Sequence, residues 1–203
     1  RRGSGRSRDF EDGQFEEQMY ITKYKDGAWS TPRSLSNMFE ESNLQESATC
    51  LTNDGTELYV VRNGNLYVSK YDTETREWQM AEELPEGINT QYEENFVCVT
   101  EAGQQMFFSS NRPGGKGGFD IYRCYRLPNG NWAKPLNMGD AINTEYDEDS
   151  PIMHPTKSIL YFSSTGHNTM GGYDIFYTPE NPTDSSFTAV VNIGYPINTP
   201  EDD

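Results

Sequence analysis

The chain is poor in basic side chains. It has 16 lysine and arginine residues against 32 aspartate and glutamate residues, and its formal net charge is −16. A nucleic-acid partner is therefore disfavoured, because binding to a phosphate backbone depends on basic side chains that release counterions. The one basic run, residues 1–8, is followed at once by an acidic stretch, residues 9–17. Its glycines and serines predict a flexible loop that neutralises its own charge.

Histidine and cysteine, the usual ligands of transition metals, are also scarce. Of the two histidines, His167 falls in a predicted loop without a second histidine, which makes it a poor candidate for metal binding or proton transfer. The three cysteines permit at most one disulfide and lack the close paired spacing of a zinc site; they are Cys50, Cys98 and Cys124. Cys50 and Cys98 stand within apolar segments, which predicts buried structural cysteine.

Long apolar runs are missing, so no transmembrane segment of roughly 18 apolar residues is expected. The apolar share is only 33% and the mean hydropathy is −0.84, values that by themselves favour a solvated chain. Aromatic residues nevertheless make up 13% of the sequence, far too many for a disordered tail. A folded domain with a thin, aromatic-rich core is therefore predicted.

What the sequence does contain is one strand pattern repeated with a period of about 50 residues. An aromatic-rich segment comes first, a second short apolar segment follows, and each copy closes on an Ile-Asn-Thr triplet. The copies of the first segment are residues 58–60, 106–108 and 160–162, and those of the second are residues 65–68, 120–122 and 174–176. The triplets are residues 88–90, 142–144 and 197–199. Hairpin dipeptides such as Asn63-Gly64 and Asn129-Gly130 separate the strands.

These repeats predict an all-β fold, a β-propeller of four-stranded antiparallel blades that is present as a partial ring. The predicted blades are residues 43–90, 91–144 and 145–199. Residues 1–42 would hold an N-terminal loop and a partial blade with only its two outer strands, and residues 200–203 would begin the next blade. The ring is expected to need further chain for its closure.

Two longer segments resemble a known repeat. Residues 109–122 read Ser-Ser-Asn-Arg-Pro-Gly-Gly-Lys-Gly-Gly-Phe-Asp-Ile-Tyr, and residues 163–176 read Ser-Ser-Thr-Gly-His-Asn-Thr-Met-Gly-Gly-Tyr-Asp-Ile-Phe. Both closely resemble the WD-like, TolB-type propeller repeat. Together with residues 132–139 and 142–148, they are similar to the version found in certain periplasmic proteins. Those proteins join helical tetratricopeptide repeats, this propeller and a C-terminal OmpA-like peptidoglycan-binding domain.

That family includes PorE-like lipoproteins of the type IX secretion system at the periplasmic face of the outer membrane. The resemblance implies a periplasmic location, association with the outer membrane through the parent protein, and docking of envelope proteins such as outer-membrane or secretion components. Peptidoglycan binding is expected only through domains that this sequence does not contain. The sequence departs from the repeat at residues 62–64, where an Arg-Asn-Gly hairpin replaces the Gly-Gly loop, and at Phe187, where tryptophan is expected.

In a propeller blade, strands A to D run from the channel outward, and the D-to-A and B-to-C connections share one face. The D-to-A connection ends in acid at one aligned position, occupied by Glu46, Glu94, Glu148 and, by extension, Asp203. We therefore expect a collar of carboxylates at the channel mouth, beside the B-to-C loops. The predicted partner-binding residues are Glu46, Glu94, Arg112, Lys116, Asp147, Glu148, Asp149, His167 and Asn168.

Crowded carboxylates raise one another's pKa or attract a cation. The collar could bind a basic peptide tail, or could hold calcium through oxygens of Glu94, Glu148 and Asp149; no other cofactor is expected. The alternative is that each acid accepts a backbone N–H bond at its own turn. The glycines of residues 114–118 are predicted to supply positive φ angles, because no helix follows them as a phosphate-binding loop requires.

Three functions fit this sequence. The favoured one is a noncatalytic protein-binding scaffold, because the acidic column is repeated whereas a catalytic site usually places different side chains at equivalent positions. The second is a propeller enzyme, either a glycosidase or a calcium-dependent lactonase, with Glu94 and Glu148 as acid and nucleophile candidates. The third is a structural spacer without a specific ligand.

Overall fold

The computed structural model describes residues 19–35, 38–39, 46–187 and 189–202. Three larger antiparallel sheets follow one another in this part of the chain, and the second and third have four strands each. The second sheet consists of β10 (Glu94–Val99), β11 (Gln105–Ser110), β12 (Asp120–Tyr125) and β13 (Leu136–Asn137). The third sheet consists of β14 (Glu148–Met153), β15 (Ile159–Ser164), β16 (Asp174–Pro179) and β17 (Val191–Asn192). Each strand pairs with its neighbour in the chain, which is the A-to-D order of a propeller blade.

The first sheet has the same order, but its outer strand is interrupted. Its strands are β5 (Glu46–Leu51), β6 (Glu57–Arg62), β7 (Asn65–Asp72), β8 (Glu77–Trp78) and β9 (Glu82–Glu83). Both β8 and β9 pair with β7. Between them, the Ala81 N–H donates to the Met38 carbonyl oxygen at 2.8 Å, so the outer edge is tied to the N-terminal part of the chain.

The N-terminal part forms a narrow, interrupted hairpin. Strand β1 (Tyr20–Ile21) pairs with β4 (Arg33–Ser34), and β2 (Tyr24–Lys25) pairs with β3 (Ala28–Trp29). The chain then passes Leu35, Met38 and Phe39, which are buried against β6 and Trp78 of the first sheet. Much of residues 1–42 lies outside the described residues.

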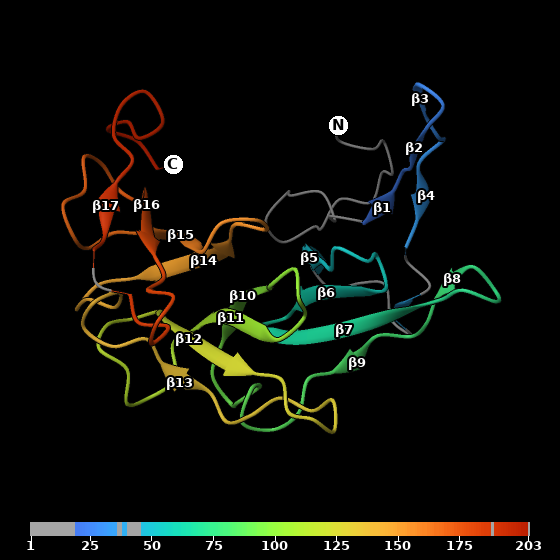
Figure 1. Cartoon of the computed structure of the whole chain (residues 1–203), viewed down its shortest axis with the longest axis horizontal. Helices are drawn as coiled ribbons and strands as arrows, with labels where there is room; N and C mark the ends of the chain where they lie inside the picture. The colour runs from blue at the N-terminus through green and yellow to red at the C-terminus, as the bar shows by residue number, and fades with distance from the viewer. Residues whose placement is uncertain (1–18, 36–37, 40–45, 188, 203) are drawn as a thin grey trace, which may run out of the picture.

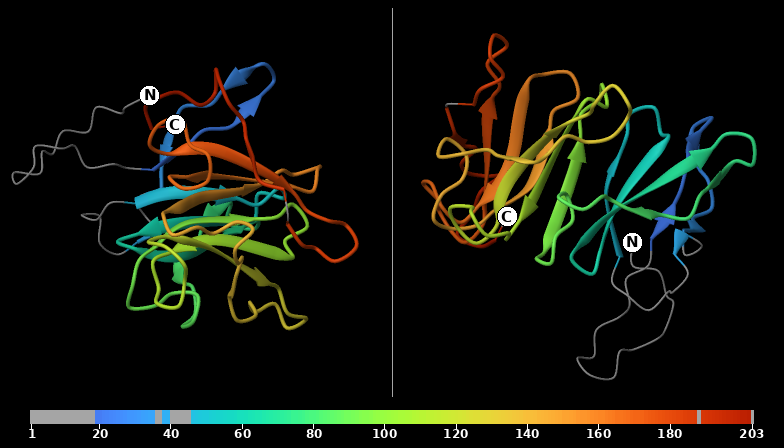
Figure 2. Two further views of the ribbon diagram at one scale, coloured as in Figure 1. Left: turned by 90° about the vertical axis from the view of Figure 1, so that its left-hand side faces the viewer. Right: turned by 90° about the horizontal axis from the view of Figure 1, so that it is seen from below.

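The sheets stack face to face in chain order, from the blue hairpin to the orange and red third sheet (Figure 1; Figure 2, right). Adjacent side chains of a strand point to opposite faces. Phe108 packs with Tyr59 and Leu66 of the first sheet, and Phe107 packs with Phe162 of the third. The all-β propeller fold with antiparallel blades is therefore confirmed, and the described sheets do not close into a ring. The blade limits at residues 43–90, 91–144 and 145–199 stay predictions.

All three cysteines are free thiols. Cys98 is buried, as predicted, but Cys50 is partly exposed, so the prediction of burial is wrong for Cys50. Cys124 is also buried. Within the residues that the structure describes, no helix is long and apolar enough to cross a membrane.

Candidate functional site

The D-to-A and B-to-C connections meet at one end of the stacked sheets. Arg112, in the B-to-C loop of the second sheet, donates to the Gly87 carbonyl oxygen at 2.7 Å and also to that of Ile88, both in the preceding D-to-A connection. At the other end of the same loop, the Phe119 N–H donates to Asp147 Oδ1 at 2.8 Å, in the following D-to-A connection. The predicted gathering of these loops is thus observed.

Glu94 and Glu148 are fully buried and are held in matching sets of hydrogen bonds. Glu94 accepts bonds from the Thr90 N–H at 3.0 Å, the Thr90 hydroxyl at 2.9 Å and the Ser110 hydroxyl at 2.9 Å. Glu148 accepts bonds from the Thr144 N–H at 2.7 Å, the Thr144 hydroxyl at 2.6 Å and the Ser164 hydroxyl at 2.8 Å. Each acid therefore accepts a backbone N–H bond at its own turn, and its donor is the threonine of the Ile-Asn-Thr triplet.

Arg112 and His167 perform the same task in successive sheets. The Arg112 guanidinium lies 5.0 Å from the ring centroid of Phe108 and 4.9 Å from that of Tyr122. The His167 ring lies 5.8 Å from Phe162 and 5.3 Å from Phe176, measured between centroids. As Arg112 bonds the Ile88 carbonyl, so His167 Nε2 bonds the Ile142 carbonyl at 2.8 Å. Both predicted partner-binding side chains thus anchor their loops to the preceding triplet.

The B-to-C loop of the second sheet packs against Asp147 of the following D-to-A connection. This contact corrects the predicted role of the glycines in residues 114–118. Among the four glycines of residues 114–118, only Gly114 has a positive φ, of 91°. A Cβ on Gly117 would collide with the Tyr146 carbonyl oxygen, and one on Gly118 with the Asp147 carboxylate. Glycine is required there because the loop lies directly against the next D-to-A connection. The prediction of positive φ angles is therefore wrong for three of the four residues.

The same contact recurs beyond the third sheet. The Tyr173 N–H donates to Asp202 Oδ1 at 3.0 Å, and a Cβ on Gly171 or Gly172 would collide with residues 199–202. Asp202 is therefore the counterpart of Asp147. Asp203, the predicted last member of the acidic column, lies outside the described residues.

Glu46 occupies its predicted place at the start of β5, but its partner differs. Its carboxylate forms an ion pair with Arg62, with Nε and Oε1 3.2 Å apart. Arg62 stands opposite Glu46 in the β5–β6 ladder, as Ser110 stands opposite Glu94. Burial raises the pKa of Glu46, and the positive charge of Arg62 partly opposes that rise.

The remaining predicted residues lie at separate places on the same face. Asp149 accepts bonds from the Asn95 side-chain amide and the Ser109 hydroxyl, so it links β14 to the second sheet. Lys116 pairs with exposed Asp140, with Nζ and Oδ1 2.7 Å apart. The Asn168 carbonyl accepts the side-chain amide of Asn192 at 2.8 Å.

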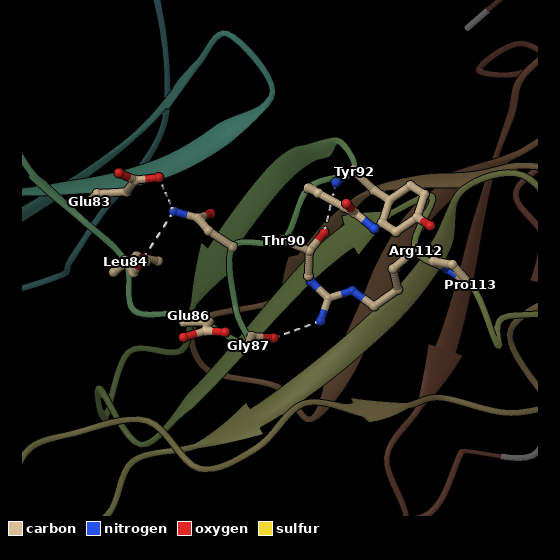
Figure 3. A pocket seen from close by; sticks show the side chains of 10 residues that line it. Glu83, Leu84, Glu86, Gly87, Thr90, Tyr92, Arg112 and Pro113 are labelled. Carbon is tan, nitrogen blue, oxygen red and sulfur yellow. Dashed lines mark hydrogen bonds between the residues drawn. The ribbon is translucent and has the colours of Figure 1, made fainter.

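An open pocket of about 810 Å³ lies between the D-to-A connection of the first sheet and the B-to-C loop of the second (Figure 3). It exists because the first sheet has only the Asn63-Gly64 turn where the second sheet has the loop of residues 111–119. Figure 3 shows Glu83 and Glu86 on one side and Tyr92 on the other. The pocket is lined by Glu83, Leu84, Glu86, Gly87, Asn89, Thr90, Gln91, Tyr92, Arg112 and Pro113.

Of these lining residues, the sequence predicted a binding role only for Arg112. The available signal was the departure from the repeat at residues 62–64. The aligned acids could not identify Glu83 or Tyr92, because these residues are exposed only where the first sheet has a short B-to-C turn in place of a long loop.

The asparagine of each Ile-Asn-Thr triplet was also missed, although the triplet itself was recognised. Asn143 accepts the Ile121 N–H at 2.8 Å and donates to the Ile121 carbonyl at 3.0 Å. Asn89 bonds Leu66 and Asn198 bonds Ile175 in the same way. In each sheet, this buried side chain takes the place of the short outer strand as the hydrogen-bond partner of the third strand.

Among the described residues, no group of three or more histidine, cysteine, aspartate or glutamate side chains is arranged to hold a metal. The predicted calcium residues also differ in their surroundings. Glu94 and Glu148 are buried under hydroxyl and N–H donors, whereas Asp149 is partly exposed and faces Asn95. Calcium binding stays a prediction.

Comparison with known proteins places the fold but not the family. No family model matches the chain, and no curated protein matches it. Among solved structures, it is similar to a TolB protein from Agrobacterium tumefaciens, with 15% identity and a TM-score of 0.53 over 91% of this chain and 65% of that one. At this identity the likeness shows a β-propeller-type fold.

Two further structures are more distant. The Dos1 propeller shares 15% identity over 73% of this chain and 37% of its own, with a TM-score of 0.48. The NanB sialidase from Streptococcus pneumoniae shares 16% identity over 90% of this chain and 29% of its own, with a TM-score of 0.47. The chain therefore spans less than two thirds of each of these three structures.

Proposed function

We propose that this chain is a noncatalytic protein-docking module of an envelope or secretion assembly, periplasmic and associated with the outer membrane through its parent protein. The resemblance of residues 109–122 and 163–176 to the repeat of PorE-like lipoproteins supports the location and the kind of assembly. The partner is an envelope protein that docks on the face formed by the D-to-A and B-to-C connections.

The observation that carries the proposal is the open pocket beside Arg112. At the next pair of sheets, Gly117 and Gly118 pack directly on residues 145–147 and fill the corresponding space. In the pocket, Glu83, Glu86 and Tyr92 are instead exposed. Two carboxylates facing an aromatic ring favour a lysine or arginine side chain, through ion pairing and contact with the ring. The net charge of −16 adds long-range attraction for a basic partner.

The surroundings of Glu94 and Glu148 support a noncatalytic role. Both carboxylates are fully buried and accept hydrogen bonds from the threonine and serine of their own turns, so neither is exposed to a substrate. Glu94 is in addition paired with Arg112. The enzymatic alternative is tested by assaying glycan and lactone panels with the protein and its Glu148→Gln variant. Hydrolysis that disappears in the variant would reject the noncatalytic proposal.

The docking proposal is tested by a crosslinking pull-down from envelope membranes with the full-length parent. We expect Glu83→Gln/Glu86→Gln and Tyr92→Ala to lower the yield of the specific partner at least about tenfold, which corresponds to about 1.4 kcal/mol. Recovery of the partner by the wild-type protein should also fall as salt is raised, because salt screens the charges.

The matched control is Glu74→Gln/Glu77→Gln. Glu74 and Glu77 are also exposed, but Glu74 lies in the C-to-D connection and Glu77 begins β8, at the opposite end of the first sheet. Equal loss in both double variants would indicate a general charge effect, and no loss in either would reject this pocket as the docking site.

A further inference from the structure

Two cysteine thiols meet where the inner strands of the first two sheets lie side by side. Cys50 lies in β5 and Cys98 in β10, each four residues after the acid that begins its strand. The Val99 N–H donates to Cys50 Sγ at 3.2 Å. Both thiols also donate to the same acceptor, because Cys50 Sγ and Cys98 Sγ each lie 3.8 Å from the Val99 carbonyl oxygen. The Val99 carbonyl oxygen thus accepts hydrogen bonds from both thiols.

We propose that Cys50 and Cys98 are a dithiol site that forms a reversible disulfide between the first and second sheets. Exposure indicates that Cys50 reacts before Cys98, because Cys50 is partly exposed whereas Cys98 is buried. A small disulfide oxidant therefore reaches Cys50 first. The site is independent of the proposed docking function, because no residue of β5 or β10 lines the pocket.

The acid–base properties of the pair support this order. The hydrogen bond with Cys98 lowers the pKa of Cys50 to about 7, while burial opposes the change. The pKa of Cys98 is raised by that hydrogen bond, by burial and by the charge of Cys50. The first thiolate of the pair therefore forms on Cys50, and a thiolate is the species that attacks a disulfide.

The reaction with glutathione disulfide balances in two exchanges. The Cys50 thiolate attacks one sulfur of glutathione disulfide, forms a mixed disulfide and releases a glutathione thiolate, which takes up a proton. Bond formation removes the Cys50 charge that raised the Cys98 pKa. Cys98 then loses its proton and attacks Cys50 Sγ, releasing the second glutathione. The two protein thiols lose two electrons in total, and the oxidant gains them.

Cys124 supplies a matched control, because it belongs to the hydrophobic cluster against which Cys50 packs. It is a fully buried free thiol of β12, and burial raises its pKa to about 12. If oxidation merely followed exposure of the core, Cys124 would react together with Cys50. If it follows the geometry at Val99, Cys124 stays a thiol.

The test is incubation of the folded protein with glutathione disulfide, followed by intact mass measurement and mapping of peptides without reduction. We expect a loss of about 2 Da in the wild type and in Cys124→Ser, with one crosslinked peptide that contains Cys50 and Cys98. Cys98→Ser should instead retain one glutathione on Cys50, and Cys50→Ser should stay unmodified. Closing the loop between the two strands should also raise the Tm of the oxidised protein by several degrees, and dithiothreitol should reverse the change.

Two results would overturn the proposal. One is a crosslink that includes Cys124. The other is a wild-type protein that keeps three free thiols under conditions in which Cys98→Ser becomes glutathionylated, since that variant proves that the oxidant reaches Cys50.

Discussion

Arg112 Nη2 lies 3.0 Å from Glu94 Oε1, and the same guanidinium bonds the carbonyl oxygens of Gly87 and Ile88. One side chain thus neutralises a fully buried carboxylate and closes the turn before it. In the third sheet, His167 bonds the corresponding Ile142 carbonyl, whereas Glu148 is held by Thr144 and Ser164. The two B-to-C loops are therefore anchored to the preceding turn in the same way, one by a guanidinium and the other by an imidazole.

Arg112→Ala should destabilise the protein by about 3 kcal/mol, because it leaves a buried carboxylate without its cation and two carbonyls without their donor. Arg112→Lys should recover only part of this loss, since an ammonium cannot reproduce the geometry of the guanidinium. Urea unfolding measures both changes. Lys116→Ala is the control, because solvent screens its ion pair with exposed Asp140, which should contribute little to stability. Equal losses for Arg112→Ala and Lys116→Ala would contradict this account.

Asn143→Ala should cost about 2 to 3 kcal/mol, because the buried N–H and carbonyl of Ile121 both lose their partner. Asn143→Asp should also destabilise, since aspartate keeps the acceptor but loses the amide donor. The control is Asn53→Ala, which removes an exposed side-chain bond to Glu101. We expect urea unfolding to show a change within about 0.5 kcal/mol for that control. A loss for Asn143→Ala no larger than this would indicate that the bonds to Ile121 are dispensable.

Gly117→Ala and Gly114→Ala distinguish two reasons for glycine within one loop. Gly117 faces the Tyr146 carbonyl oxygen, whereas Gly114 has a φ of 91° and open space around it. We expect alanine to cost about 1 kcal/mol at Gly114 through backbone strain, and about 2 to 3 kcal/mol at Gly117 through a steric clash. Hydrogen exchange at the Gly118 amide, which donates to the Tyr146 carbonyl, should accelerate only in Gly117→Ala. The reverse order of costs would restore the positive-φ interpretation for Gly117.

The repeat was sufficient to predict the strand order, because paired aromatics such as Phe107 and Phe108 alternate between two packed faces. It also placed Glu94 and Glu148 at equivalent turns. Contacts between neighbouring sheets were not predictable in the same way. The close approach of Gly118 to Asp147 depends on how two loops far apart in the sequence meet in space.

The pocket was hidden for a related reason. It exists because the first sheet has only a short turn at Asn63-Gly64, whereas an alignment of repeated residues emphasises what the copies share. The proximity of Cys50 to Cys98 was missed because the sequence places both at one repeat position but does not show that neighbouring inner strands bring that position together.

Glu46 provides a pH test of the inner strand. Burial raises its pKa above the ordinary value of 4.5, so the folded protein binds this proton more tightly than the unfolded chain. The contribution of Glu46 to the free energy of unfolding should therefore be largest below pH 4.5 and should fall as the pH rises through the higher folded value. Glu46→Gln cannot titrate, so the wild-type minus variant difference should decrease over this range in urea unfolding.

Asp54 gives the matched case with the opposite sign. Hydrogen bonds from Thr52 and Thr56 lower its pKa below 3.8 in an exposed turn. Its contribution should therefore be present above pH 3.8 and should be lost as the pH falls through the lower folded value. The wild-type minus Asp54→Asn difference should increase as the pH rises towards 3.8, whereas the Glu46 difference should decrease at higher pH. If the Glu46 difference instead rises with pH, the ion pair with Arg62 outweighs burial at the start of β5.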